Sequence, residues 1–313
     1  MAKVMLLDGQ GKARETAYAD YKKLPKNSLS WTHLVSSEEK AVDFVLDELG
    51  QDEEFEEDIL EDQRPRLSAE HSYDIIVLTV PIKKIAKAHE SEDALLQLSF
   101  IAFQHRLITV ADMKAPIIDQ IFTQLGKKGL ETPSVSSLFN FIVSGVVENS
   151  IDAMELVEKR IDQIQSTIIQ GKTLQEMLTL SEQIKETLYY STKLLRADLE
   201  VFWEILAGKA ISIKAELFYE HIEDRVLYLI DLSEGLRESL QNILNLYLAA
   251  LSNRMNQHIY RLTNIGAFFL IPTMIASIWG MNVELPFHNF WSILLVSFGV
   301  SFIFAIYLWL IKR

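Results

Sequence analysis

Apolar residues are most concentrated near the C-terminal end of the chain, in two long segments separated by a short stretch. Residues 262–283 contain no Asp, Glu, Lys, Arg or His, and the same holds for residues 290–311. A helix of either length would extend about 33 Å, enough to cross the ~30 Å hydrocarbon core of a bilayer. Globular cores seldom need helices this long and this free of charge. The pattern therefore predicts two transmembrane helices, joined by a loop over residues 284–289.

Basic residues near the ends of the two spans predict their orientation. Arg254 and Arg261 precede the first span and Lys312 and Arg313 follow the second, whereas residues 283–289 contain no Lys or Arg. Because Lys and Arg accumulate on the cytoplasmic side of membrane proteins, we expect both termini in the cytoplasm. The apolar run at the start of the chain is too short for a secretory signal. We therefore expect a multi-pass protein of the cytoplasmic membrane, with everything before the first span cytoplasmic.

The region before the first span has the periodicity of one long helix. We assign residues 211–261 to a stalk helix that continues into the first span, in which Pro272 permits a bend. Apolar residues of the stalk recur at alternating steps of three and four, which is typical of a packed helical seam. Only Ser233 interrupts the series, which consists of Ile222, Val226, Leu229, Leu236, Leu240, Ile243 and Tyr247. We expect this seam to be a surface on which copies of the chain assemble.

The N-terminal part of the chain mixes strand and helix patterns. Residues 1–135 are predicted to form a cytoplasmic α/β domain, with strands at 3–7, 30–35, 73–80 and 105–112 and a helix at 36–50. In that helix Ser36 or Ser37 can cap the start, and Gly50 ends it. Residues 136–210 have a helical pattern that is broken near 170–173 and again at 207–210. This pattern predicts two long helices that run antiparallel.

The charge balance excludes one class of partner. The chain has 43 acidic against 30 basic residues and a formal charge of −13. Binding to nucleic acid depends on Lys and Arg that neutralise phosphates, so we expect no nucleic-acid partner. Carboxylates dominate residues 51–62, which we interpret as a solvated surface segment to which no ligand is assigned.

Sequence motifs for catalysis are also absent. The chain has no Gly-rich phosphate loop, no paired metal-ligand motif and no nucleophile elbow. Seven histidines are scattered without ligand spacing, at His33, His71, His89, His105, His221, His258 and His288. We therefore expect neither an enzyme nor an organic cofactor.

The two spans of one chain cannot enclose a water-filled path, because a conduit needs a ring of helices. If the protein conducts ions, several copies must surround a central axis. The first span is the better wall because it carries polar and small residues, namely Asn264, Gly266, Thr273, Ser277 and Asn282, although such residues also mediate ordinary helix packing. The second span is almost wholly apolar and suits a lipid-facing position. In a ring, the carboxamides of Asn282 would present neutral oxygens that hold hydrated Mg²⁺ through its waters without retaining it.

The end of the first span also carries a family resemblance. Gly280, Met281 and Asn282, followed by a short acidic and aromatic loop, a terminal span and a basic C-terminus, resemble the CorA family of magnesium channels. The similarity extends upstream through residues 246–257, 224–238 and, more faintly, 61–66. The three-residue motif alone is weak, but its position between two terminal spans is specific.

The resemblance implies a funnel-shaped homopentamer whose first span lines the pore, with Mg²⁺ as the cargo, Co²⁺ and Ni²⁺ as further candidates, and gating by cytoplasmic Mg²⁺. Gly280, Met281 and Asn282 would form the selectivity filter at the outer mouth. The family register would place further pore-lining residues at Asn256, Ile259, Leu262, Gly266, Leu270 and Thr273. Among these, the apolar side chains would form constrictions that gate by dewetting.

Two positions depart from the family pattern. Trp279 stands before the Gly-Met-Asn motif where the family usually has Tyr. A family position that supplies a carboxylate to a regulatory cation site between subunits matches His221, so that site would draw on Glu220, His221, Glu223 and Asp224 with altered ligands. Because His is a favourable Zn²⁺ ligand, a Zn²⁺ transporter of the same superfamily is one alternative. The other is a membrane-anchored helical scaffold or sensor that transports nothing.

Overall fold

The computed structural model describes residues 3–16, 28–35, 64–70, 72–82, 95–169, 175–214, 220–281 and 289–311. The predicted helix at 36–50 and the acidic segment at 51–62 lie outside the described residues, as do Asn282 and residues 284–288 of the loop between the spans. The chain divides into two compact units, Met1–Asn242 and Ile243–Arg313. Helix α6 contributes to both units.

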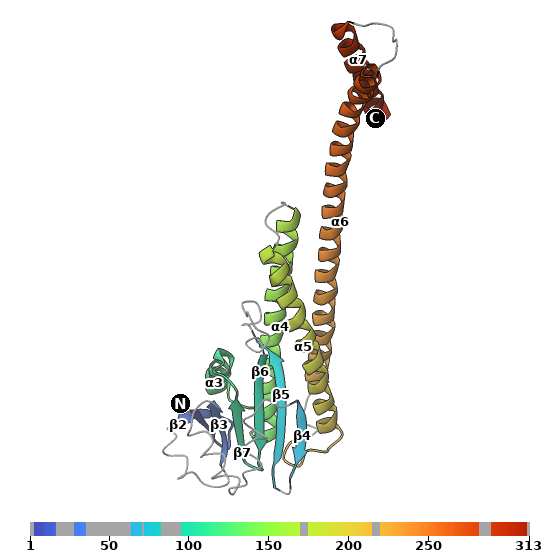
Figure 1. Cartoon of the computed structure of the whole chain (residues 1–313). Coiled ribbons are helices and arrows are strands. Elements are labelled where there is room, and N and C mark those ends of the chain that lie inside the picture. The colour runs from blue at the N-terminus through green and yellow to red at the C-terminus, as the bar shows by residue number, and fades with distance from the viewer. Residues whose placement is uncertain are drawn as a thin grey trace. The chain divides into compact units, whose positions relative to one another are not determined.

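The first unit contains a seven-stranded sheet with the order β2-β1-β3-β7-β6-β5-β4 (Figure 1). Strands β3 and β7 are parallel, and the other neighbouring pairs are antiparallel. The strands are β1 (Lys3–Leu7), β2 (Ala13–Thr16), β3 (Leu29–Val35), β4 (Arg66–Ala69), β5 (Asp74–Pro81), β6 (Leu95–Ala102) and β7 (Arg106–Ala111). The four strands predicted from the sequence correspond to β1, β3, β5 and β7, and the α/β class is confirmed.

Three strands were not predicted from the sequence, for two reasons. Strand β6 is buried along almost its whole length, so it lacks the alternation of polar and apolar residues that marks a half-exposed strand. Strands β2 and β4 have only four residues each and lie at the two edges of the sheet. Short edge strands carry few apolar residues, and the hydropathy pattern therefore gave no signal for them.

Helix α3 (Pro116–Lys128) was also not predicted, and it covers the N-terminal part of the sheet. Pro116 starts the helix, and Ile118, Ile121, Phe122 and Leu125 are buried. The ring of Phe122 stacks on Trp31 of β3 with ring centroids 3.9 Å apart.

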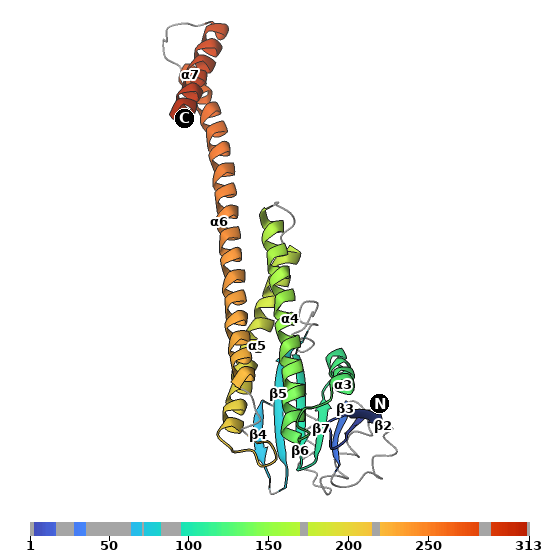
Figure 2. The same cartoon turned by 180° about the vertical axis from the view of Figure 1, so that it is seen from behind.

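Helices α4 (Val135–Ile169) and α5 (Gln175–Leu206) are the two long antiparallel helices expected from the sequence. Both pack against the sheet, and Figure 2 shows α4 in front of strands β5 and β6 in that view. The ring of Phe139 on α4 meets Phe100 of β6 edge to face, with centroids 4.9 Å apart. The hydroxyl of Ser150 donates to the carbonyl oxygen of Pro81 at 2.7 Å. The C-terminal part of the sheet and these two helices share one core.

Two side chains attach the segment that precedes α6 to this core. Both carboxylate oxygens of Asp74, a buried residue at the start of β5, accept backbone N–H groups, from Ile211 at 2.8 Å and Ser212 at 2.6 Å. The hydroxyl of Ser136 on α4 accepts the N–H of Lys214 at 2.9 Å. The sheet and α4 therefore fix the chain a few residues before α6 begins.

Helix α6 (Glu220–Trp279) corresponds to the long helix predicted across the stalk and the first span. Its predicted start at residue 211 is wrong, because residues 211–214 are not helical and backbone N–H groups among them bond to Asp74 and Ser136. The helix also ends at Trp279, before the predicted end of the span at residue 283. Its 60 residues correspond to a length of about 90 Å. The stalk seam is confirmed as a packed surface, since Ile222, Val226, Leu229, Leu236 and Leu240 are at most 5% exposed. At the interruption of the seam, Ser233 Oγ lies 2.9 Å from Thr192 Oγ1 of α5.

The expectation that copies of the chain assemble through the stalk seam is wrong for its five buried residues, Ile222, Val226, Leu229, Leu236 and Leu240. Their partners belong to the same chain, as the Ser233–Thr192 contact shows. Val226 shares a small cavity with residues of α4, α5 and the sheet. A side chain that its own chain buries is not available to a second copy.

The second unit consists of the remainder of α6 and helix α7 (Phe290–Ile311). Phe268 of α6 contacts Phe298 of α7, with ring centroids 6.3 Å apart. Ser297 and Ser301 of α7 are buried, and each hydroxyl donates to a carbonyl oxygen one turn earlier in the same helix, at 2.7 and 2.9 Å. Small side chains with satisfied hydroxyls allow two helices to approach closely in a membrane.

Candidate functional site

The last two helices have the length and composition of membrane spans. The most apolar 18-residue windows of α6 and α7 have mean hydropathies of 1.6 and 2.1. None of the first window and 11% of the second are buried in the chain. A core helix of a soluble protein with such hydropathy would be covered by its own chain. The exposed apolar surface of these helices fits a bilayer and further copies instead.

One face of the span in α6 packs toward α7. Its half-buried residues are Asn264, Ala267, Phe268, Ile271, Pro272, Ile275 and Trp279. Because successive residues of a helix are rotated by roughly 100°, these positions share one side of α6, the side on which Phe268 meets Phe298. Asn264 belongs to this side, so the expectation that it contributes to a pore wall is not supported.

The opposite face of α6 carries the residues predicted to line a pore. Asn256, Ile259, Leu262, Gly266, Leu270 and Thr273 are all exposed. Helical geometry places them within an arc of about 120°, centred roughly opposite the face that meets α7. Leu262 and Leu270 are 72% and 69% exposed. The structure therefore brings the predicted residues together on one free surface, which nothing in the described chain covers.

Two hydroxyls on this span donate hydrogen bonds to backbone carbonyl oxygens. Thr273 Oγ1 donates to the carbonyl oxygen of Phe269 at 2.8 Å, and Ser277 Oγ donates to that of Thr273 at 2.8 Å. A hydroxyl has one proton and two lone pairs, so what remains to face outward is an acceptor. Acceptors are the groups that a cation or its hydration waters need.

The helix ends where the proposed filter begins. Trp279 is its last residue, and the N–H of Gly280 still bonds to the carbonyl oxygen of Ala276 at 3.0 Å. Met281 is 61% exposed, and its N–H donates to the carbonyl oxygen of Ile278 at 3.2 Å. The last turn of a helix leaves carbonyl oxygens without intrahelical partners, so further acceptors are available at the end of α6. Asn282, the third residue after this end in the sequence, lies outside the described residues.

The predicted regulatory residues lie at the start of α6, and the structure does not join them into one site. Glu223 Oε1 accepts the indole N–H of Trp203 on α5 at 2.7 Å. His221 lines a hollow of about 450 Å³ between α4 and α6, together with Glu148 and Arg225. Arg225 Nη1 approaches Glu148 Oε2 only to 3.9 Å. Asp224 is exposed, and the side chain of Glu220 lies outside the described part of the chain.

The described side chains among these groups do not form a cation site within one protomer. Among the described residues, no three His, Asp or Glu side chains come close enough to hold a metal ion. A site between subunits that uses His221, Glu223 or Asp224 stays a prediction. The contact of Glu223 with Trp203 was not predicted from the sequence. Its signal in the sequence was weak: Trp203 is a large aromatic residue near the end of a polar helix.

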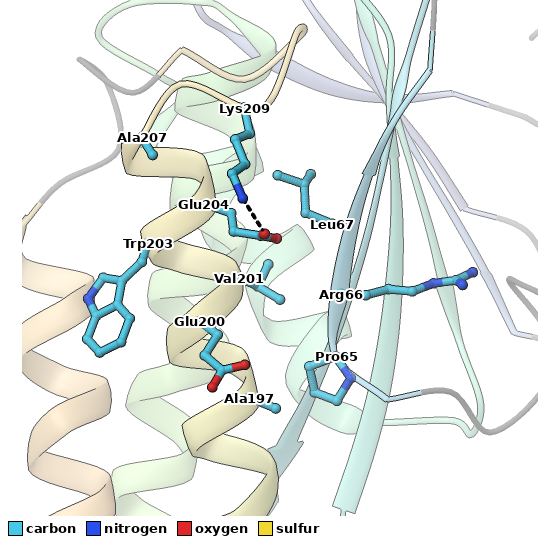
Figure 3. Close-up of a pocket in the computed structure, with 10 residues that line it drawn as sticks. All are labelled: Pro65, Arg66, Leu67, Ala197, Glu200, Val201, Trp203, Glu204, Ala207 and Lys209. Carbon is cyan, nitrogen blue, oxygen red and sulfur yellow. Dashed lines mark hydrogen bonds and ion pairs between the residues drawn. The ribbon is translucent and has the colours of Figure 1, made fainter.

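A second hollow, of about 500 Å³, lies between β4 and α5 (Figure 3). Pro65 and Leu67 form one wall, and Glu200 and Glu204 stand on the other. Lys209 Nζ pairs with Glu204 Oε1 at 2.7 Å. One of the two carboxylates is thus already neutralised by the chain itself, and this hollow does not have the chemistry of a divalent-cation site.

Comparison with known proteins decides the family. The family model described as CorA-like Mg²⁺ transporter protein matches residues 26–313. The chain belongs to the CorA family. A CorA relative from Thermotoga maritima, named cobalt/magnesium transport protein CorA, is 26% identical over 235 residues, which cover 73% of this chain and 65% of the relative. The chain thus matches just under two thirds of that relative's length. A CorA protein of the same name from Methanocaldococcus jannaschii is 23% identical over 256 residues, 78% of each chain.

Solved structures agree on the CorA fold. The complete structure of the CorA magnesium transporter from Methanocaldococcus jannaschii has a TM-score of 0.81 at 20% identity and covers 98% of this chain and 96% of its own. The full-length CmaX protein has a TM-score of 0.77 at 16% identity, with the same coverage. At these identities the likeness concerns the fold alone. It extends over the α/β part and both C-terminal helices.

Proposed function

We propose that several copies of this chain surround a central path and carry divalent cations across the cytoplasmic membrane, with Mg²⁺ as the main cargo and Co²⁺ and Ni²⁺ as further candidates. The observation that carries the proposal is the exposed face of α6 that runs from Asn256 to Met281, opposite the face that meets α7. Two relatives bear the name cobalt/magnesium transport protein, which supports the choice of cargo.

Along this face the chemistry changes from polar to apolar. Asn282, with the free carbonyl oxygens of the helix end, would receive the hydrated cation at the outer mouth. Neutral oxygens bind a divalent cation more weakly than carboxylates do, so the ion can leave again. Ser277 and Thr273 supply further acceptors, and Leu270, Leu262 and Ile259 follow as apolar constrictions. An empty ring of such side chains excludes water, and therefore ions, until it widens.

A ring of five copies, as the resemblance implies, would place the exposed face of α6 around the axis and α7 toward lipid. Helix α7 suits that position, since most of its apolar side chains are exposed in the protomer. The orientation with both termini in the cytoplasm follows from the distribution of Lys and Arg.

Regulation by cytoplasmic Mg²⁺ would act on the beginning of α6. Each copy carries a formal charge of −13, so copies that approach one another repel unless cations lie between them. Cations bound near Glu220, His221, Glu223 and Asp224 of neighbouring copies would favour the compact, closed assembly. When cytoplasmic Mg²⁺ is scarce these positions empty, and the constriction at Leu262 is freer to widen.

Uptake by the full chain in liposomes tests the proposal, with Mg²⁺, Co²⁺, Ni²⁺ and Zn²⁺ compared. We expect Asn282→Ala to abolish uptake while the assembly stays intact, because the change removes an acceptor and little packing. Asn264→Ala is the matched control, since Asn264 lies on the side of α6 that meets α7; its uptake should stay close to that of the wild type. Normal uptake by an assembled Asn282→Ala protein would refute the role of the filter.

The same assay separates the alternatives. Uptake of Zn²⁺ without Mg²⁺ would favour the zinc transporter. An assembled wild-type protein that moves none of the four cations would favour the scaffold or sensor.

A further inference from the structure

Asp198 is a carboxylate in the interior of the first unit. It lies on α5 and is 1% exposed. It lines a small cavity whose other walls come from β5, β6, α4, α5 and α6, with Leu78, Phe100, Val147 and Val226 among them. Every lining residue except Asp198 is apolar. A lone carboxylate in such surroundings requires an explanation, because burial of an unpaired charge is strongly unfavourable.

The hydrogen bonds of Asp198 satisfy only half of its carboxyl group. Its Oδ1 accepts the backbone N–H of Thr79 on β5 at 2.9 Å. Within the described part of the chain its Oδ2 has no hydrogen-bond partner, and neither has the hydroxyl of Thr79. The cavity offers about 10 Å³, which is about the least that one water molecule needs. An ionised carboxylate could not be hydrated there.

No charge among the described residues compensates for the burial. Among the described residues, β5, β6, α4 and α6 direct no titratable side chain into the cavity. The nearest charged residues of α4 and α6 in sequence, Glu148 and Arg225, line a different hollow. Burial raises the pKa of Asp198 well above its ordinary value, and the N–H of Thr79 opposes this only in part. The neutral acid is the form that fits the site.

We propose that Asp198 is a proton-binding site that joins the sheet to the three long helices, and that loss of its proton as the cytoplasmic pH rises loosens this joint. Ionisation would draw water to Oδ2 and separate α5 from β5. Val226 of α6 lies in the same wall, so the loosening reaches the helix that carries the face from Asn256 to Met281. The link to transport rests on the proposed function, whereas proton binding by Asp198 does not.

The sign of the pH effect follows from the raised pKa. The folded chain keeps the proton of Asp198 at pH values where the unfolded chain has lost it. The folded state therefore binds more protons, and stability falls as pH rises from near the ordinary carboxyl pKa up to the folded pKa. Asp198→Asn keeps an acceptor for Thr79 and cannot ionise, so it removes this loss.

Thermal unfolding of the purified full chain in detergent, from about pH 5 to about pH 9, tests the site. We expect Asp198→Asn to be more stable than the wild type, by a margin that grows with pH. The ratio of the two unfolding constants should change by up to tenfold per pH unit. Glu200→Gln is the matched control, an exposed carboxylate two residues further on α5, and its curve should parallel the wild type. Parallel curves for Asp198→Asn and the wild type would overturn the proposal.

An infrared measurement on the wild type needs no variant to fold. With carboxyl-¹³C aspartate and a detergent free of carbonyl groups, a protonated carboxyl band that shifts with the label is expected at neutral pH. Absence of any labelled protonated band would overturn the proposal.

Liposome flux at several internal pH values tests the link to α6. Flux that changes with internal pH in the wild type and not in Asp198→Asn supports the link, and an equal pH response in both proteins overturns it. If neither protein conducts any cation, the proposed function fails, and unfolding and infrared spectra still decide the proton site.

Discussion

Helix α6 has an apolar face in each of the two units, and the chain buries one of these faces and leaves the other exposed. In the first unit, the apolar side chains of the seam, from Ile222 to Leu240, are buried by the chain's own helices. In the second unit, Ile259, Leu262 and Leu270 on the face opposite α7 are exposed. The spacing of apolar residues along the helix is similar in both parts, so the two faces differ in what covers them. A face that its own chain covers contributes to folding, whereas a face left bare on a single chain is available for lipid, for other copies or for a path between them.

The largest effect is expected from a charge placed in the buried part. Leu229→Asp should lower the free energy of unfolding by about 4 kcal/mol, because it buries an unpaired carboxylate and removes packing. Leu227→Asp, two residues away on an exposed side of the helix, should cost much less. Thermal unfolding in detergent compares them, and equal losses would mean that the seam is not packed as described.

A polar residue in the exposed part should leave folding intact and change flux. Leu262→Ser should weaken the apolar constriction and raise leak in the presence of high internal Mg²⁺ by about tenfold, equivalent to about 1.4 kcal/mol. Ile271→Ser serves as control because Ile271 is half-buried on the α7 side. Unfolding and flux are measured on the same preparations. A leak as large in the control would remove the distinction between the two faces.

Neutralisation of the carboxylates at the start of α6 should affect closure and not conduction. In a protein with Glu220→Gln, Glu223→Gln and Asp224→Asn, the internal Mg²⁺ needed to halve the flux should rise by about fivefold. The cause is the loss of cation ligands between copies. Flux without internal Mg²⁺ should stay unchanged. Undiminished block by Mg²⁺ in this variant would place the sensor elsewhere.

The smallest effect concerns the indole that holds Glu223. Trp203→Phe removes the N–H donor at 2.7 Å and leaves the carboxylate free for a cation, so closure should need about twofold less Mg²⁺. Tyr190→Phe, another exposed aromatic change on α5, should have no effect. A rise in the Mg²⁺ requirement would show that Trp203 instead positions Glu223 for binding.

Much of the fold could be predicted because its signals are local. The strands at 3–7, 30–35, 73–80 and 105–112 have short apolar or β-branched runs between breaks, and they occur as β1, β3, β5 and β7. Strand β6 and helix α3 were missed. The first has no alternation because both of its faces are buried. The second is a short amphipathic helix whose buried face is defined only by the sheet below it.

The candidate site was predicted in part. The chemistry of residues 256–282 and their steps of three and four placed most of the pore-lining set on one face, and the structure shows that face exposed. The seam was assigned to the wrong partner, because the spacing of Leu229, Ser233 and Leu236 is the same whether a second copy or α5 covers it. Asn264 was grouped with the wall of the path because sequence alone does not say which side α7 occupies.

Spans, helix breaks and charge asymmetry depend on residues near one another along the chain, and the sequence by itself determines them. The extent of α7 over residues 290–311 belongs to that class. Which side of α6 is covered, and by what, depends on residues such as Thr192 and Phe298 that are distant in sequence. The same holds for Asp198, whose position on α5 does not distinguish it from exposed acidic residues of that helix. Its neutrality results from walls supplied by five separate elements, because desolvation depends on everything that surrounds a group in space.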